Sequence, residues 1–162
     1  MKTIFITGAS RGIGFEMARQ SLSCGNRVIA SCRNPDDADE LNSLMDSYDQ
    51  LDLLEMDVCS NDSVNACLSH LYSKRQPIDL LFNNAGIIDW RNFHEISEDS
   101  FARIYQTNVV GAFLCLRACL PCLRLSGSPL VVNLSSRLGS IDLRGETQLG
   151  GAIAYQCSKS GL

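Results

Sequence analysis

The chain has 162 residues, of which 45% are apolar and 20% are charged, so residues 1–162 can bury a core and are expected to form one globular domain. The net charge of −4 at pH 7 provides no basic surface for nucleic acid or an anionic membrane, which excludes both as partners. The first residues have too short an apolar core for a signal peptide, and no apolar run approaches the length of a membrane span. These features predict a cytoplasmic protein.

Apolar, partly β-branched segments alternate with segments that carry helix signals, which is typical of a parallel sheet with helices on both faces. The five predicted strands are Thr3–Thr7, Arg27–Cys32, Asp52–Val58, Asp79–Phe82 and Leu130–Ser135. Helices are expected to begin at Asn34 with Pro35, at Ser60 and at Ser97. The last of them is a long helix that should run to about Pro121–Arg124, and Arg137–Gly151 is predicted to be a long loop.

Eight cysteines are scattered along the apolar segments, which favours reduced thiols over a disulfide framework. Cys115, Cys119 and Cys122 have the spacing that places side chains on one face of a helix. No His lies close to them in the sequence to complete a metal site. We therefore predict no metal, and expect these thiols to be small buried side chains.

A glycine-rich turn follows the first predicted strand directly and opens a predicted helix. Its sequence is Thr7-Gly8-Ala9-Ser10-Arg11-Gly12-Ile13-Gly14. Glycine permits a tight turn with close backbone approach, and amides at a helix N-terminus favour a pyrophosphate. A simple strand-to-helix turn is the alternative, but the order of strand, turn and helix favours a dinucleotide site.

The spacing Gly-x-x-x-Gly-x-Gly differs from the usual Gly-x-Gly-x-x-Gly and resembles the short-chain dehydrogenase/reductase family. Further segments agree with that family in content and order: Asp57-Val58, Asn83-Asn84-Ala85-Gly86, Asn108-Val109-Val110-Gly111, Asn133-Leu134-Ser135-Ser136, and then Tyr155 and Lys159. Ser-Cys-Arg-Asn-Pro after the second strand and the long interval from Ser136 to Tyr155 look most like the C-signal and sniffer-type carbonyl reductases.

The resemblance spans essentially the whole chain and implies a Rossmann-like, doubly wound α/β fold with about five parallel strands in the order 3-2-1-4-5. Family members continue beyond the Tyr-Lys helix through a sixth strand, a substrate loop and a seventh strand, so we expect a domain that is incomplete at its C-terminus. Leu130–Leu134 would then form an exposed apolar sheet edge, and the short Tyr155 helix would be weakly held.

The second strand ends in Ser31-Cys32-Arg33 with no acid until Asp36, so the carboxylate that clamps an NAD ribose is missing. Arg33 and Arg11 are expected to approach a 2'-phosphate, which predicts NADP(H); the alternative is that both are solvated surface charges. The cofactor-binding residues implied by the resemblance are Gly8, Ser10, Arg11, Gly12, Ile13, Gly14, Arg33, Asp57, Val58, Asn84, Ala85, Gly86, Tyr155 and Lys159. Taken alone, Asp57 and the Asn-Asn-Ala-Gly segment would be turn residues.

Tyr155 is the predicted general acid for carbonyl reduction and the base for the reverse reaction, with Lys159 one helical turn away. A free phenol has a pKa of about 10, so proton exchange at neutral pH needs a nearby cation. The resemblance implies that Ser136 binds the substrate oxygen and that Asn108 holds a water linking Lys159 to solvent. Ser135 and Ser136 cannot both enter the site on a regular strand, and Ser136 matches the family pattern. For an isolated Tyr-x-x-x-Lys, an ordinary helix-surface pair is the alternative.

The predicted function is NADP(H)-dependent hydride transfer between nicotinamide and a small carbonyl or alcohol substrate. The alternative is a catalytically impaired fragment that acts only as a nucleotide-binding or interaction module. Longer epimerase and dehydratase relatives are disfavoured by their glycine spacing and chain length. A homo-oligomer through the Asn108 helix and the Tyr155 helix is expected to be weakened, because the second helix is cut short.

Overall fold

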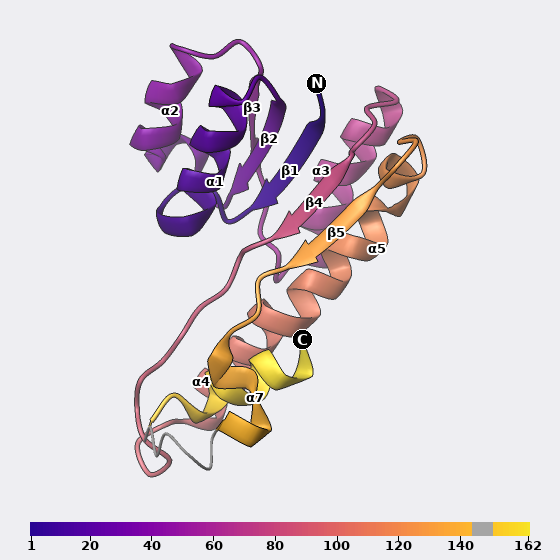
Figure 1. Ribbon diagram of the computed structural model, residues 1–162. Helices are drawn as coiled ribbons and strands as arrows, with labels where there is room; N and C mark the ends of the chain where they lie inside the picture. The colour runs from indigo at the N-terminus through magenta and orange to yellow at the C-terminus, as the bar shows by residue number, and fades with distance from the viewer. Residues whose placement is uncertain (144–150) are drawn as a thin grey trace.

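The computed structural model describes residues 1–143 and 151–162. Its centre is a five-stranded parallel sheet with the strand order β3-β2-β1-β4-β5 (Figure 1). The strands are β1 (Thr3–Thr7), β2 (Arg27–Cys32), β3 (Leu51–Glu55), β4 (Leu80–Asn83) and β5 (Leu130–Asn133). The predicted Rossmann-like α/β architecture and its strand order are confirmed. β5 is at the edge of the sheet, where Leu130 is 58% exposed.

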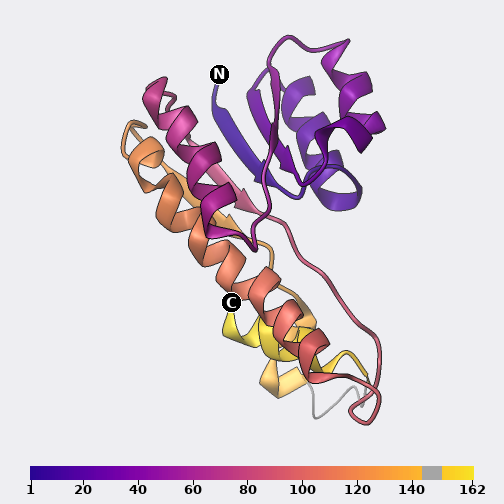
Figure 2. The same ribbon diagram turned by 180° about the vertical axis from the view of Figure 1, so that it is seen from behind.

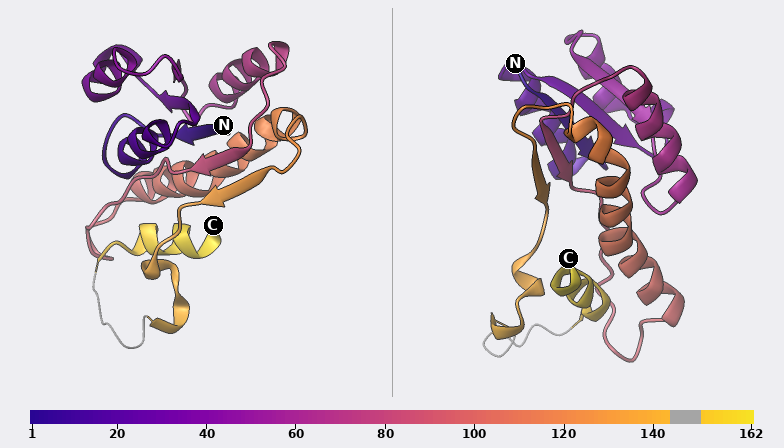
Figure 3. Two further views of the ribbon diagram at one scale, coloured as in Figure 1. Left: turned by 45° about the horizontal axis from the view of Figure 1, so that its top comes forward. Right: turned by 90° about the vertical axis from the view of Figure 1, so that its right-hand side faces the viewer.

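Helices cover both faces of this sheet, as Figures 1 and 2 show from opposite sides. One face carries α1 (Gly12–Ser23) and α2 (Asp39–Met45), and the other carries α3 (Asn61–Ser73) and α5 (Gly111–Leu123). Two further helices, α4 (Glu98–Tyr105) and α7 (Ile153–Gly161), pack against each other beyond the carboxyl ends of the strands (Figure 3). The chain therefore forms a covered sheet with a smaller helical region at its carboxyl edge.

The central strand β1 shows why the sequence adopts this arrangement. Phe5 packs into the core beneath α3 and α5, whereas Ile4 and Ile6 on either side of it pack beneath α1 and α2. A parallel strand covered on both faces needs apolar residues on both, and every residue of β1 is buried.

The predicted carboxyl ends of two strands were too long. β3 ends at Glu55 rather than Val58, because Asp57 begins a turn in which its Oδ1 accepts the N–H of Cys59 at 2.9 Å. β5 ends at Asn133 rather than Ser135, because Ser136 caps a 3-10 turn at Arg137–Gly139. That turn occupies the start of the predicted long loop, and residues 144–150 of the loop lie outside the described part of the chain.

Two of the three predicted helix starts are confirmed. Ser60 and Ser97 cap α3 and α4, each accepting a hydrogen bond of 3.2 Å from a backbone N–H three residues on. Asn34 instead precedes a short 3-10 helix, Pro35–Asp37, and α2 begins separately after Ala38. The long helix ends at Leu123 as expected, but it contains a π-helical segment, Gln106–Val110, that the sequence did not indicate.

The helix from Glu98 to Leu123 is long and apolar enough to cross a membrane by length and composition, with a mean hydropathy of 1.3. This corrects the expectation that no apolar run reaches such a length. The helix packs against α3 and β4, and its apolar residues from Leu114 to Leu123 contribute to the core. Only part of its apolar surface is buried in this way, since 39% of its most apolar window is buried and Phe113 is 56% exposed.

Cys115, Cys119 and Cys122 lie in the same core, together with Cys67 of α3, as expected for buried thiols. Burial raises the pKa of Cys67 to about 11 and that of Cys115 to about 12. Thiols in this environment stay protonated at neutral pH and pack as small apolar groups.

Asp79 joins three strands at the amino edge of the sheet. Its carboxylate accepts hydrogen bonds from the hydroxyl of Ser126 at 2.6 Å and from the N–H of Thr3 at 2.7 Å. Its backbone N–H donates to the Thr3 carbonyl, and its carbonyl accepts from the N–H of Leu130, both at 2.9 Å. The Ser126 hydroxyl and the Thr3 N–H lower the pKa of this carboxyl group below its ordinary value.

We predict that Asp79→Asn lowers the free energy of unfolding by about 1 kcal/mol at pH 7, because an amide replaces a charged acceptor. The folded-state pKa is lowered, so the stabilisation is complete above the unfolded pKa of about 4 and is lost as the pH falls through the folded value. Urea unfolding of both proteins between pH 7 and pH 2.5 measures this. A difference that stays constant below pH 4 would contradict the role of the carboxylate.

Candidate functional site

The glycine-rich turn joins the carboxyl end of β1 to α1. Gly8 and Gly12 have φ values of 64° and 59°, a region that favours glycine. Gly14 is required by packing, because an added Cβ would lie 2.5 Å from the carbonyl oxygen of Gly8. Around Gly12 an added Cβ would meet nothing within 4 Å, so its backbone is open to a ligand at the start of α1. Ile13, another predicted binding residue, is 59% exposed beside it.

The segment after β4 is fixed to this turn by hydrogen bonds. The side-chain amide of Asn84 donates to the carbonyl oxygens of Thr7 and Gly8, both at 2.9 Å. The backbone N–H groups of Asn84 and Ala85 donate to the Thr7 hydroxyl, both at 3.1 Å. Two predicted cofactor segments, which are distant in the sequence, are therefore hydrogen-bonded to each other. The central role of the Thr7 hydroxyl was not predicted.

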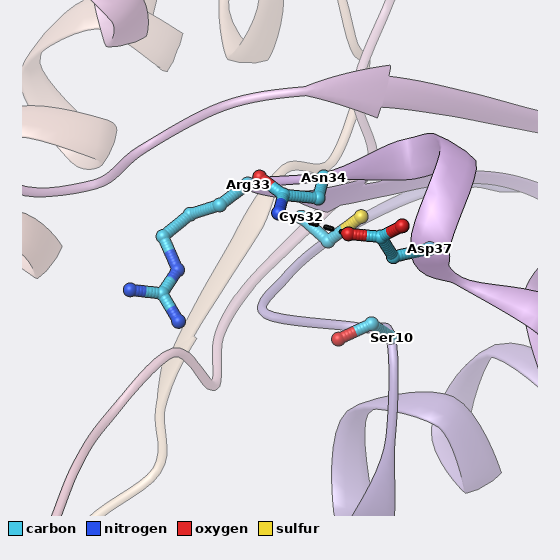
Figure 4. A pocket seen from close by; sticks show the side chains of 5 residues that line it. All are labelled: Ser10, Cys32, Arg33, Asn34 and Asp37. Carbon is cyan, nitrogen blue, oxygen red and sulfur yellow. Dashed lines mark hydrogen bonds between the residues drawn. The ribbon is translucent and has the colours of Figure 1, made fainter.

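A cavity of about 360 Å³ opens next to the glycine turn at the end of β2 (Figure 4). Its lining residues are Ser10, Cys32, Arg33, Asn34 and Asp37. Ser10 and Arg33, two of the predicted cofactor-binding residues, thus line one cavity, whereas Arg11, which was expected to approach a 2'-phosphate together with Arg33, does not line it. Asp37 was not predicted as a site residue, because the sequence does not show that the Pro35–Asp37 turn folds back over the end of β2.

Asp57 and Val58, which the sequence placed at the end of the third strand, follow β3 in a turn. The N–H of Asp57 donates to the hydroxyl of Ser63 at 3.0 Å. Because Ser63 lies in the first turn of α3, this bond joins the turn after β3 to that helix. Val58 is buried against Gly111, where an added Cβ would lie 3.0 Å from a Val58 methyl carbon. Both residues have a structural role in this position, and both lie at the carboxyl edge of the sheet.

Tyr155 and Lys159 lie one turn apart on α7. The ammonium nitrogen of Lys159 donates to the carbonyl oxygen of Leu134 at 2.6 Å and lies 5.6 Å from the centroid of the Tyr155 ring. Lys159 is only 7% exposed, and burial lowers the pKa of its ammonium group. A desolvated ammonium favours negative charge close to it, so the geometry suits a phenol that must become a phenolate.

Ser136 is held between two contacts that join its segment to α7. Lys159 binds Leu134 on one side of it, and the Ser160 hydroxyl donates to the Gly139 carbonyl on the other at 2.7 Å. The Ser136 Oγ accepts the N–H of Leu138 at 3.2 Å. That bond occupies an oxygen lone pair and leaves the hydroxyl proton to donate to a ligand. Because β5 ends at Asn133, strand alternation does not decide between Ser135 and Ser136, which corrects that argument.

Asn108 lies in the π-helical segment and bridges two parts of the site. Its Oδ1 accepts the N–H of Ile87 at 2.8 Å, while its Nδ2 donates to the Ile87 carbonyl and to the Ser158 hydroxyl, both at 2.9 Å. Both side-chain donors are therefore used within the protein. A water held by Asn108 would therefore bind mainly to the backbone carbonyl of Asn108. This residue lies in a π-helical segment, where backbone hydrogen bonds depart from the regular α-helical pattern.

The loop after β4 also positions the start of α7, which the sequence did not reveal. Asp89 accepts hydrogen bonds from Arg91 and from the hydroxyl of the buried Ser100 on α4, the latter at 2.8 Å. The Arg91 carbonyl accepts the N–H of Ala152 at 3.2 Å, one residue before α7 begins. Asp89 and Ser100 are 11 positions apart, and Arg91 and Ala152 are 61 apart, so no local sequence pattern identifies these two contacts.

The model of the short chain dehydrogenase family matches residues 2–162. The chain belongs to the short-chain dehydrogenase/reductase family. The NADPH-bound carbonyl reductase from chicken fatty liver superimposes on it with a TM-score of 0.93 at 29% identity, over 100% of this chain and 70% of that one. The carbonyl reductase Sniffer of Drosophila melanogaster gives 0.90 at 31% identity, over 100% and 71%.

A curated relative in this family, the NADPH-dependent pterin aldehyde reductase of Arabidopsis thaliana, is 32% identical over 139 residues. The match covers 85% of this chain and 57% of that protein. The chain thus spans a little over half the length of the curated relatives that it matches.

Gly139 offers a test of how α7 is positioned in this member of the family. A Cβ added there would lie 2.7 Å from the backbone carbonyl carbon of Lys159, so Gly139→Ala must displace the helix. We predict a loss of about 1–3 kcal/mol in the free energy of unfolding and faster hydrogen exchange in α7. Gly127→Ala is the matched control, because an added Cβ there meets nothing within 4 Å. Equal effects of the two substitutions would contradict this packing role.

Proposed function

We propose that this chain carries the cofactor and proton-transfer machinery of an NADP(H)-dependent carbonyl reductase, with a small carbonyl or alcohol compound as substrate. The observation that carries the proposal is the buried Lys159 ammonium lying 5.6 Å from the centre of the Tyr155 ring. The likeness to the NADPH-bound chicken carbonyl reductase and to the NADPH-dependent pterin aldehyde reductase supports the choice of cofactor and reaction.

The residues of the glycine turn fit a dinucleotide. The open space at Gly12 and the backbone N–H groups at the start of α1 suit a pyrophosphate, with Ile13 beside them. Arg33 and Ser10 would hold the 2'-phosphate end in the cavity after β2, and Arg11 would add positive charge nearby.

The remaining cofactor residues follow the carboxyl ends of the other strands. Asp57 and Val58, after β3, would flank the adenine. The segment from Asn84 through Ala85 to Gly86 would lead to the nicotinamide ribose, which Tyr155 and Lys159 would bind. This assignment places all contacts along one edge of the parallel sheet, where ligands of such folds bind.

A bound cofactor supplies the hydride that adds to the carbonyl carbon of the substrate. The Ser136 hydroxyl, whose oxygen is already occupied by the Leu138 N–H, donates to the substrate oxygen and orients it. The Tyr155 hydroxyl gives its proton to that oxygen, so one O–H bond forms as the other breaks. Lys159 stabilises the resulting phenolate, and a water at the Asn108 backbone returns the proton from solvent.

A nucleotide-binding or interaction module without turnover is the second candidate. It is favoured by one observation, namely that the open turn at Gly12 and the cavity lined by Arg33 lie on elements separate from the α7 helix that carries Tyr155 and Lys159. Titration with NADPH beside an assay of NADPH oxidation with aldehydes and ketones separates the two, because binding without turnover supports the module.

Three further expectations are part of the proposal. The chain forms one nucleotide-binding domain, it acts in the cytoplasm, and copies of it associate through the long Asn108 helix and α7. Light scattering tests the last of these, and a stable tetramer would contradict the predicted weak association.

Tyr155→Phe tests the proton donor. The phenol oxygen is removed while the ring beneath the Lys159 ammonium is kept, so we predict a fall in turnover of at least about 100-fold with NADPH affinity nearly unchanged. Stopped-flow oxidation of NADPH and a parallel fluorescence titration measure the two quantities. Retained turnover would exclude Tyr155 as the acid.

Arg33→Ala tests the 2'-phosphate site. Loss of a charge-assisted hydrogen bond is predicted to weaken NADPH binding by about 10-fold to 100-fold and to leave NADH binding unchanged. Arg11→Ala is the comparison, since Arg11 does not line the cavity and a smaller effect is expected. Wild-type protein that binds NADH as tightly as NADPH would refute the arginine argument.

A further inference from the structure

The cavity after β2 contains a second charged group, of opposite sign to Arg33. Asp37 contributes its side chain from the 3-10 helix Pro35–Asp37. In Figure 4 the Arg33 side chain extends away from Asp37, while Asp37 and the Ser10 hydroxyl lie on the other side of the opening. Because both residues line the same cavity, one ligand group that enters between them would be in the field of both charges.

Neither charge is neutralised by an ion pair. In the described ranges 1–143 and 151–162, the ion pairs are Arg19–Glu16, Arg27–Asp52 and Arg91–Asp89. The Asp37 carboxylate accepts one hydrogen bond, from the neutral side-chain amide of Asn34 at 3.1 Å. That bond fixes the position of the carboxylate without cancelling its charge.

We propose that Asp37 is a specificity-determining residue that opposes Arg33 in the choice between NADPH and NADH, an inference that rests on the proposed dinucleotide function. A carboxylate repels a 2'-phosphate but accepts a hydrogen bond from the 2'-hydroxyl that takes its place in NADH. Arg33 donates to the phosphate. The two residues therefore act on the same ligand group in opposite directions, and the preference for NADPH is smaller than Arg33 alone would give.

The substitution Asp37→Asn isolates this effect, because it removes the charge and keeps the size and the possibility of a bond to Asn34. We expect NADPH to bind about 3-fold to 10-fold more tightly and NADH to bind equally well or more weakly. Asp36→Asn is the matched control: it removes the same charge from the neighbouring exposed position, which does not line the cavity. We expect a change of less than about 2-fold in the NADPH to NADH ratio for the control.

The measurement is isothermal titration of the full chain and both variants with NADPH and NADH. A second titration with adenosine 2',5'-bisphosphate and adenosine 5'-monophosphate removes the nicotinamide and tests the 2'-phosphate directly. The gain from Asp37→Asn should decrease as salt is raised, because the interaction is electrostatic. Far-ultraviolet circular dichroism of each variant confirms that the fold is retained.

A ratio of affinities that is the same in Asp37→Asn and Asp36→Asn overturns the inference. If Arg33→Ala still weakens NADPH binding in that case, the proposed cofactor site stands and only the role of Asp37 fails. A wild-type chain that binds none of the four ligands overturns both.

Discussion

One charge-assisted hydrogen bond, from the Lys159 ammonium to the Leu134 carbonyl oxygen, connects α7 to the carboxyl end of β5. Burying an ammonium is unfavourable unless it is hydrogen-bonded, so this bond determines where the Lys159 side chain comes to rest. The same nitrogen lies over the ring of Tyr155, which couples the position of the phenol to the sheet through the amine. The close contact between Gly139 and the Lys159 backbone keeps the Ser136 turn against the same helix. Three candidate catalytic residues therefore depend on how closely α7 approaches the end of one strand.

The segment from Asn84 to Ile87 links the cofactor turn to the helical region. At one end, the Asn84 amide binds the backbone of the glycine turn; at the other, the Asn108 amide binds both backbone groups of Ile87 and the hydroxyl of Ser158. Both asparagines use their side-chain N–H donors within the protein. Amides suit this task because each provides donors and an acceptor in one plane, and neither adds a charge that burial would penalise. The segment is thus hydrogen-bonded to the glycine turn at one end and, through Asn108 and Ser158, to the helix that carries Tyr155 and Lys159 at the other.

The features that the sequence predicted correctly depend on local patterns or on the joint order of motifs. Buried strands such as Thr3–Thr7 are apolar runs, Ser60 and Ser97 are helix caps with a recognisable context, and the order of the motifs indicated the family. The features that it missed come from contacts between distant residues. Asp89, in the loop after β4, bonds Ser100 of α4, and the two residues meet only in the folded chain. Asp37 reaches the cavity because a short 3-10 turn carries it there. The π-helical segment contains Asn108, whose side chain bonds Ile87 and Ser158, and helical periodicity in the sequence reveals neither feature.

In the proposed reaction, the burial of Lys159 would assist proton transfer from Tyr155. An ammonium has three N–H donors, and in the described part of the chain this one donates to the Leu134 carbonyl alone. Desolvation lowers its pKa because the charged form lacks hydration, so any oxygen that brings negative charge or a lone pair to the amine is bound more strongly than it would be in water. A ribose hydroxyl and a phenolate are two such groups. The Lys159 ammonium can therefore bind a further oxygen acceptor beside Tyr155. In the proposed reaction it would bind the Tyr155 oxygen most strongly once the phenol has given its proton to the substrate oxygen.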